Sequence, residues 1–424
     1  MNCEILTATV TFREQPFAKP LQLSSGTITE ITEATATVRV RVNGKEAEGR
    51  GCIYLSDLWA WPDPVLTHAA RDAEMRRLCG SLATQLPRES GSIHPLEAGL
   101  RLHDHATALT TDSVPLLARL VCASPLDAAI HDAWGQAQGR SAFAFYEEPC
   151  AIPSADGLFP GGAISAIRAM LLPAPAPSVD GWYVVSGTDT LTDDFAAFVQ
   201  QRGFRCFKLK THGKDPDADA RRTVQVYQTA RALGVKSPRL SADSNEGNPD
   251  ADSVFAYLDA LQRMDAGAYA ALEYLEQPTG RDIVQHAFDW HAVSARKPVL
   301  IDEGLTGTDV LPHVAEQGWS GICLKTCKGH SFNLIAGAWA HARGLKLAVQ
   351  DLTNPGLAAI HSCLLAQHVP SINGVELNSP QFTPAANDAW TGHEAGLFTP
   401  TDGCHQVTDP MTPGLGSRLG HTGG

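Results

Sequence analysis

Charged side chains at the ends of short apolar runs are the most informative feature of this sequence. The first example is the stretch FKLK, which contains Lys208 and Lys210. Successive residues of a strand face opposite ways, so both lysines would point to one side, with Phe207 and Leu209 on the other. Two neighbouring ammonium groups repel each other, and lysine is seldom buried without a partner. A solvent-exposed edge strand explains these four residues unless anionic groups face them.

Three further apolar runs end in carboxylates. RLSADSN ends in Asp243, with Asn245 close behind, LEYLEQP ends in Glu276, and VLIDEG ends in Asp302 and Glu303. Each acid taken alone could cap a helix or form a turn. Three carboxylates from three successive strands would instead make an oxygen cage for a hard dication, and Mg²⁺ prefers such ligands. The series therefore predicts a Mg²⁺ site.

The lysines complete a pattern that suits carbon-acid chemistry. GICLKTCKGH ends in Lys325, with Lys328 and His330 just beyond. Lys210 on the second strand and Lys325 on the sixth would flank the cage. A lysine close to a dication and a second ammonium has a lowered pKa, so it can act as a base near neutral pH. Lys208 would keep Lys210 partly deprotonated. The set suits removal of a proton α to a carboxylate, because the metal stabilises the enolate that results.

The elements that must position these residues alternate regularly from about residue 182 onward. Short apolar runs are followed by helical stretches, and the strand candidates are GWYVVSG, FRCFKLK, RLSAD, AALEYLE, PVLIDE, GICLK, LKLAVQD and INGVELN. Repeated β/α units imply a parallel sheet, and eight of them favour a closed barrel with its active site at the carboxyl ends of the strands. An open doubly wound sheet is the alternative. It is disfavoured because no glycine-rich phosphate loop follows an early strand.

The first 180 residues have a different character. Residues 1–55 alternate like a β-meander, with a hairpin signal at Asn43–Gly44. Residues 65–140 have helical periodicity and end in SPLDAAIHDAWGQAQGRS. Residues 150–178, with the run LLPAPAPS, are typical of a linker. A smaller N-terminal domain thus precedes the barrel.

Composition excludes several classes of function. The chain has 424 residues, is 43% hydrophobic and carries a net charge of −13. That charge argues against nucleic-acid and anionic-membrane partners, which bind basic patches. The first twenty residues lack a basic start followed by a long apolar run, so they are not expected to be a signal peptide, and no apolar stretch of membrane-spanning length is seen. The ten cysteines are scattered, so reduced thiols and a cytoplasmic location are expected.

The motifs K-x-K, D-x-N, E-Q-P, D-E-G and K-T-C-K-G make the chain resemble the enolase superfamily, in particular its mandelate racemase and muconate lactonizing enzyme family. The resemblance covers nearly the whole length. It implies an α/β fold with an α+β capping domain over residues 1–150, a linker over 151–180, a modified (β/α)7β TIM-like barrel over 181–385, and a C-terminal segment over 386–424 that returns to the cap.

The resemblance also implies roles for individual residues. Asp243, Glu276 and Asp302 would be the Mg²⁺ ligands. Asp302 is preferred to Glu303 because the ligand comes first in the family's D-E pattern. Lys210 and Lys325 would be the acid–base pair. Lysines on both the second and sixth strands look like the muconate lactonizing branch.

The residues expected at the substrate come from the remaining strand ends, namely Asn245, His330, Gln350, Asp351, Glu376 and Asn378. The seventh strand ends in Gln350 and Asp351, without the histidine used by the mandelate racemase branch. Glu376 and Asn378 stand where dipeptide epimerases have paired aspartates, which disfavours a dipeptide substrate. Specificity loops are expected at REQPFAKPLQLSSG and YLSDLWAWPDPVL. Trp59 and Trp61 of the second loop would contact a ring-bearing substrate or pack on the barrel rim.

Several functions fit these expectations. The favoured one is racemisation or epimerisation of a small carboxylate by two opposed lysines. β-Elimination, including dehydration, and cycloisomerisation need the same first step. A non-catalytic barrel that binds a carboxylate would not need both lysines. A phosphate-handling barrel would need glycine-rich loops after the seventh and eighth strands, where only NPGLAA is a faint match. A homo-oligomer is expected from the resemblance.

Overall fold

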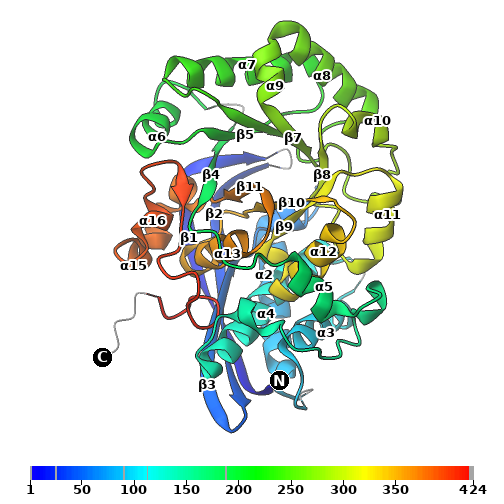
Figure 1. Ribbon diagram of the computed structural model, residues 1–424, viewed down its shortest axis with the longest axis vertical. Helices are drawn as coiled ribbons and strands as arrows, with labels where there is room; N and C mark the ends of the chain where they lie inside the picture. The colour runs from blue at the N-terminus through cyan, green and yellow to red at the C-terminus, as the bar shows by residue number, and fades with distance from the viewer. Residues whose placement is uncertain (1, 24–25, 89–90, 112, 187–188, 420–424) are drawn as a thin grey trace.

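Two β-sheets organise the chain in the computed structural model, which describes residues 2–23, 26–88, 91–111, 113–186 and 189–419 (Figure 1). The first is an antiparallel sheet of β1 (Glu4–Leu23), β2 (Gly26–Val42) and β3 (Lys45–Tyr54). Helices follow it in the order α1 (Asp57–Ala60), α2 (His68–Gln85), α3 (Pro95–Ala108) and α4 (Leu116–Gln138). We refer to β1–β3 and α1–α4 as the cap. Helix α4 packs across β3 and β2, so it joins the cap sheet to the rest of the molecule.

The second sheet closes into a parallel barrel. Its strands are β4 (Val179–Val185), β5 (Cys206–Lys210), β6 (Arg239–Asp243), β7 (Leu272–Glu276), β8 (Val299–Ile301), β9 (Gly321–Lys325), β10 (Lys346–Gln350) and β11 (Ser371–Glu376). Each strand pairs with the next along the chain, and β11 pairs back onto β4. All eight predicted strands and the predicted closed barrel are therefore confirmed.

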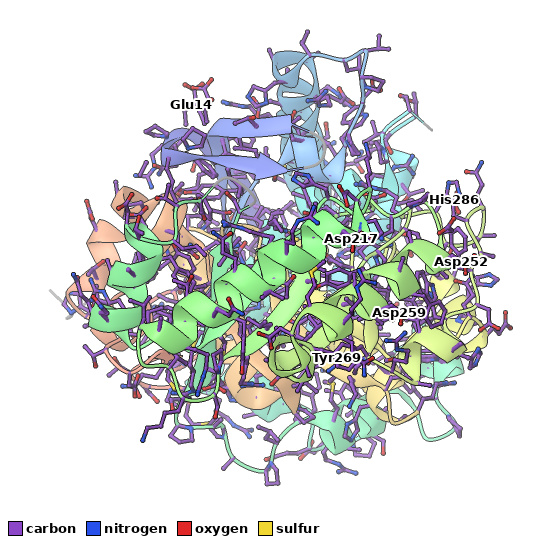
Figure 2. All side chains as sticks on the ribbon, turned by 90° about the horizontal axis from the view of Figure 1, so that it is seen from above. Glu14, Asp217, Asp252, Asp259, Tyr269 and His286 are labelled. Carbon is purple, nitrogen blue, oxygen red and sulfur yellow. The ribbon has the colours of Figure 1, made fainter. Side chains whose placement is uncertain are left out.

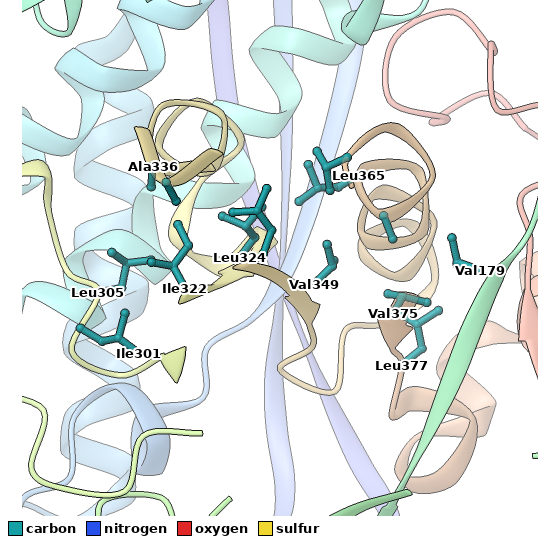
Figure 3. Packing of buried hydrophobic residues seen from close by; sticks show 14 of the residues in the cluster. Val179, Ile301, Leu305, Ile322, Leu324, Ala336, Val349, Leu365, Val375 and Leu377 are labelled. Atoms are coloured by element: carbon teal, nitrogen blue, oxygen red, sulfur yellow. The ribbon is translucent and has the colours of Figure 1, made fainter. Parts of the chain in front are cut away.

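Helices cover the outside of the barrel. The longer ones are α6 (Asp194–Arg202), α7 (Pro216–Ala232), α8 (Ala251–Met264), α12 (His330–His341) and α13 (Gly356–His368). The shorter ones are α9 (Ala266–Ala271), α10 (His291–Ser294) and α11 (Leu311–Glu316). Their polar faces are turned to solvent, as Asp217 on α7 and Asp259 on α8 show (Figure 2). Their apolar faces pack on the strands, for example Ala336 and Leu365 near Leu324 and Val349 (Figure 3).

Strand β1 is longer than the sequence indicates. The stretch REQPFAKPLQLSSG was expected to be a loop, yet β1 continues through it to Leu23. The prolines are tolerated because β1 is an edge strand, where a missing N–H need not break the ladder. Its register against β2 shifts between Pro16 and Leu21. The resulting hairpin carries Phe17 and Leu21 to the barrel mouth, where they contact Val184 and its neighbours.

The segments that flank the barrel are also structured. Residues 150–178 contain helix α5 (Ala163–Met170), whose buried face packs against α12. After the barrel come α14 (Ser379–Phe382), α15 (Asp388–Thr391), α16 (Ala395–Phe398) and β12 (Cys404–His405), which pairs antiparallel with β4. The chain then returns to α4, where Asp132 accepts the backbone N–H of Leu415 at 2.7 Å. Within the described residues, none of the helices combines the length and apolar character required to span a membrane.

Candidate active site

The barrel interior is built in two layers that follow from strand periodicity. The lower layer is apolar and consists of Trp182, Cys206, Tyr274, Leu300, Cys323 and Ala348. Inward side chains recur every second residue, so the next inward positions lie two residues nearer the carboxyl ends. Five of these six positions are polar, namely Lys208, Glu276, Asp302, Lys325 and Gln350, and the sixth, after Trp182, is Val184. The strand ends identified from the sequence are thus brought together above this apolar layer.

Lys208 is the central cation of this upper layer. Its side chain is only 1% exposed, and its Nζ lies 2.8 Å from Glu276 Oε1, 2.8 Å from Glu376 Oε2 and 3.1 Å from Asp243 Oδ2. Burial alone would lower the pKa of Lys208, but the three carboxylates outweigh it and raise the pKa well above its usual value. The sequence assigned Lys208 the task of acting on Lys210. The structure pairs Lys208 with carboxylates from three other strand ends, and its effect on Lys210 stays a prediction.

Lys210 lies on the same face of β5 as Lys208, as predicted, and reaches the rim. Its Nζ donates to Asp243 Oδ2 at 2.6 Å and to Asn245 Oδ1 at 3.0 Å. Asp243 is fully buried, which would raise its pKa, yet Lys210 and Lys208 together hold the pKa of Asp243 below its usual value. Asn245 and Glu246 follow β6 with positive φ angles of 43° and 70°. This left-handed turn aims the Asn245 side chain back at Lys210.

Lys325 and Lys328 both contact Asp302. Lys325 Nζ lies 2.6 Å from Asp302 Oδ2, and Lys328 Nζ lies 3.1 Å from Asp302 Oδ1 and 2.6 Å from its backbone carbonyl. Burial opposes the charge of Lys325, but Asp302 raises its pKa well above the usual value. Sequence reasoning assigned no role to Lys328. The spacing of three residues between Lys325 and Lys328 could have indicated this contact. The short 3-10 turn Thr326–Lys328 folds Lys328 back onto the same carboxylate.

Glu303 connects the barrel to the cap. Its Oε1 accepts the indole N–H of Trp59 at 2.8 Å and the amide of Asn245 at 2.9 Å. Burial, together with Asp302 and Asp243, raises the pKa of Glu303 to about 7. The Trp59 ring also lies under Lys325, with Nζ 4.6 Å from the ring centroid. Trp59 was expected at the substrate or the barrel rim, and its contact with Glu303 was not predicted.

The opposite side of the mouth is formed by β10 and β11. Gln350 donates to Glu276 Oε2 at 2.5 Å and accepts from Lys208 at 3.1 Å. Asn378 donates to Glu376 Oε1 at 2.8 Å. Asp351 accepts the backbone N–H of Asn378 at 2.5 Å, and burial raises its pKa to about 7. These residues hold one another and Lys208 in place.

A narrow pocket lies between the cap and the strand ends. The cap supplies an apolar wall of Phe17, Leu21, Ile28, Ile31 and Trp59. The barrel supplies a polar floor of Lys208, Lys210, Lys325, Asp351, Glu376 and Asn378. Lys210 and Lys325 therefore face one cavity. They stand on β5 and β9, which are four strands apart in either direction around the closed barrel.

His330 does not lie at this pocket, which corrects its expected position at the barrel mouth. Its Nδ1 is 2.9 Å from Nε2 of His361, and its ring centroid is 4.5 Å from that of His131. Helix α12 begins at His330, and its first turn is turned toward α4 and α13. The His330 side chain is consequently buried where helix α4 of the cap meets the barrel.

The acidic residues fit a hard cation in chemistry, although they are not gathered around one centre. Among the described residues, no three acidic, histidine or cysteine side chains converge closely enough to hold an ion. The Lys208 ammonium occupies the place between Asp243 and Glu276, so one cation already bridges two of the three predicted ligands. Burial and the charge of Asp243 still raise the pKa of Glu276 well above normal. Another cation would relieve the repulsion between Glu276 and Asp243 that contributes to this raised pKa.

The family to which this arrangement belongs is shown by comparison with known proteins. Residues 190–421, more than half of the chain, match the family model described as Enolase C-terminal domain-like. The chain therefore belongs to the enolase superfamily, in its mandelate racemase and muconate lactonizing enzyme family, and is an enzyme of that superfamily. A search of curated protein sequences gives no match.

Solved structures with the same fold align over almost the whole chain. A dipeptide epimerase from Cytophaga hutchinsonii, complexed with Mg and a dipeptide, has a TM-score of 0.67 and 16% identity over 98% of this chain and 95% of its own. A muconate lactonizing enzyme from Pseudomonas fluorescens has a TM-score of 0.62 and 17% identity over 98% and 96%. A mandelate racemase/muconate lactonizing protein from Herpetosiphon aurantiacus has a TM-score of 0.63 and 21% identity over 96% and 97%. These matches show the fold.

Proposed function

We propose that this enzyme abstracts the α-proton of a small carboxylate substrate in a Mg²⁺-dependent reaction, and that its product is the opposite stereoisomer. The observation that supports two-sided chemistry is the placement of Lys210 and Lys325, which line one pocket from opposite strands of the barrel. A base on each side can remove a proton from one face of the α-carbon and return it to the other. This arrangement permits racemisation or epimerisation by two bases.

Asp243, Glu276 and Asp302 would hold the Mg²⁺. The ion supplies electrostatic stabilisation of the negative charge that develops on the substrate carboxylate when the α-proton leaves. The lysines now bound to these carboxylates would then lose part of their counter-charge. Since carboxylates are what raise the pKa of Lys325 in this structure, that loss lowers the pKa toward the range of a useful base.

The remaining pocket residues would orient the substrate. A neutral or apolar substituent is favoured because the cap wall of Phe17, Leu21 and Ile28 is apolar. An ammonium substituent is disfavoured at Glu376, since Lys208 already pairs with this carboxylate at 2.8 Å. Asp351 and Asn378 bind each other and lie at the pocket edge, where they can contact polar groups of the substrate.

Hydrogen exchange at the α-carbon tests the proposal most directly. The protein is incubated with Mg²⁺ and a panel of single-enantiomer α-substituted carboxylates in D₂O, and deuterium incorporation is followed by mass spectrometry. Lys210→Ala should reduce the rate of exchange from one enantiomer by roughly 10²–10⁴-fold, and Lys325→Ala should reduce the rate from the other enantiomer by a similar factor. Lys346→Ala, at the opposite end of β10, is the matched control. Exchange that persists from both enantiomers in both variants would overturn the assignment of the bases.

The same experiment separates the competing reactions. β-Elimination or cycloisomerisation would produce exchange from one enantiomer only, together with a product of different mass or ultraviolet absorption. A protein that binds carboxylates without activity would give no deuterium incorporation at the α-carbon of any substrate in the panel.

Calorimetric titration with Mg²⁺ tests the metal site independently of any substrate. Asp243→Asn and Glu276→Gln should each weaken Mg²⁺ binding by at least about tenfold, because each removes one anionic ligand. Asp259→Asn on the outer face of α8 is the control. Equal affinity in all variants would place the metal elsewhere.

A further inference from the structure

Trp59 is the cap residue most closely engaged with the catalytic lysines. It lies in the short helix α1, is 5% exposed, and forms part of the pocket wall. Its ring face lies 4.6 Å from Lys325 Nζ, within the range of a cation–π contact. Its indole N–H donates to Glu303 Oε1 at 2.8 Å. One side chain from the cap thus contacts two residues of the barrel in two different ways.

The hydrogen bond to Glu303 continues toward the second lysine. Asn245 Nδ2 donates to the same Glu303 oxygen at 2.9 Å, and Asn245 Oδ1 accepts from Lys210 Nζ at 3.0 Å. A continuous series of contacts therefore runs from Lys325 through Trp59, Glu303 and Asn245 to Lys210. It crosses the pocket along the side on which the acidic strands β6–β8 lie.

The backbone that carries Trp59 is anchored on both sides. In the cap, Asp57 forms a buried ion pair with Arg71 at 2.7 Å. From the barrel, Arg281 donates to the carbonyl oxygen of Trp59 at 3.1 Å and pairs with Glu246. Helix α1 is therefore attached to the cap and to the loops after β6 and β7 at the same time. Trp59 is held where it can fix other side chains.

From these contacts we propose that Trp59 is a positioning residue for both catalytic lysines. Its ring face seats Lys325, while its N–H orients Glu303 and, through Asn245, the amine of Lys210. The proposal rests on the proposed function in taking these two lysines as the bases. It adds that alignment of the two bases depends on the cap being docked, because the residue that connects them belongs to the cap.

Two substitutions separate the two contacts. Trp59→Phe keeps an aromatic face for Lys325 but loses the N–H to Glu303, whereas Trp59→Leu loses both. In the exchange experiment above, Trp59→Phe should reduce Lys210-dependent exchange by roughly tenfold and leave Lys325-dependent exchange nearly intact. Trp59→Leu should reduce exchange on both sides by roughly tenfold or more. Trp61→Phe, in the apolar core of the cap, is the matched control.

A purely structural role for Trp59 would give a different pattern. Loss of packing would lower the melting temperature and reduce exchange on both sides equally in Trp59→Phe and Trp59→Leu. Restoration of Lys325-dependent exchange by Phe and not by Leu supports the ring-face contact. Equal reduction of the two sides in Trp59→Phe would overturn the proposal.

Amine labelling provides a readout that needs no substrate. The full-length protein is treated briefly with acetic anhydride, and acetylation of Lys325 is quantified by peptide mass spectrometry against the exposed Lys236. Trp59→Leu should raise the Lys325 rate by roughly tenfold, because the ring no longer covers the amine, and Trp59→Phe should leave it near the wild-type rate. Unchanged labelling in Trp59→Leu would overturn the positioning role. The expected labelling pattern without α-exchange in the wild type would support the contact and overturn the proposed function.

Discussion

At the scale of single residues, the arrangement around Lys208 shows how charges are kept inside the barrel. A buried ammonium is expensive to desolvate, and three carboxylates within about 3 Å compensate it. Burial and the nearby charge of Asp243 outweigh the attraction of Lys208, so the pKa of Glu276 is still raised well above its usual value. Lys208 is therefore the buried cation that holds these three carboxylates together.

Replacing Lys208 tests this balance. Lys208→Met should lower the free energy of unfolding of the metal-free protein by about 3–5 kcal/mol, because it leaves buried carboxylates without their cation. Added Mg²⁺ should stabilise this variant more than the wild type, since the ion replaces the missing charge. Chemical denaturation with and without Mg²⁺ measures both effects, and Lys236→Met is the control. Equal stability of the variant and the wild type would show that Lys208 does not balance the acids.

Buried histidines predict a loss of stability in acid. Burial lowers the pKa of His361 to about 3, whereas an unfolded histidine titrates near 6.5. The stability that a neutral His361 provides is complete above pH 6.5 and is lost as the pH falls from there toward 3. Between pH 7 and pH 5 this amounts to about 2 kcal/mol.

The variant His361→Gln should remove that part of the pH dependence. Its free energy of unfolding should therefore fall less steeply than that of the wild type between pH 7 and pH 5. Urea titrations at several pH values measure the slopes. The exposed His291 serves as the control position, and an unchanged slope in His361→Gln would contradict the lowered pKa.

At the scale of elements, glycines decide how closely the cap helix approaches its sheet. A Cβ atom at Gly49 of β3 would overlap the backbone of Ala133 on α4, so only glycine allows this contact. A Cβ atom at Gly80 of α2 would meet no described atom within 4 Å. The two positions make a matched pair.

Alanine at these two glycines should have opposite effects. Gly49→Ala should lower the free energy of unfolding by about 2–3 kcal/mol, because α4 must move away from β3. Gly80→Ala should raise the free energy of unfolding by about 0.5–1 kcal/mol, because alanine favours the helix and lowers the conformational entropy of the unfolded chain. Thermal unfolding distinguishes the two outcomes. Destabilisation by both would show that the helix, rather than the contact, is sensitive.

The elements that could be predicted from the sequence are those with local periodicity. All eight barrel strands were predicted because apolar runs alternate with helical stretches, and their polar ends coincide with the site. Helix α5 was not predicted, since its eight residues lie between glycine and proline and become helical by packing on α12. The contact of Trp59 with Glu303 joins residues 244 positions apart, so no local pattern indicates it.

At the scale of the whole molecule, the fold and family are confirmed, while the assigned roles of the site residues, the homo-oligomeric state and the domain boundaries stay predictions. The cap sheet and the C-terminal segment meet at Asp132 of α4. This buried carboxylate accepts the backbone N–H of Arg50 at 2.9 Å and that of Leu415 at 2.7 Å. It thereby joins the cap sheet to the end of the chain.

Removing this junction should loosen the whole molecule. Asp132→Ala should lower the free energy of unfolding by about 2–3 kcal/mol, because buried N–H groups lose a charged acceptor. Asp132→Asn, which keeps one acceptor oxygen, should cost less. Denaturant titration measures the loss, and hydrogen exchange of the amides of Arg50 and Leu415 locates it. Unchanged exchange at both amides would show that Asp132 does not hold the tail.

The diametric placement of β5 and β9 has a consequence for how this scaffold diversifies. Each amine belongs to its own strand, so replacement of one lysine removes one base and leaves the other in the chain. Under the proposed function, a single amino-acid substitution would convert an enzyme that acts on both faces of the α-carbon into one that acts on a single face. The fold would not need to change.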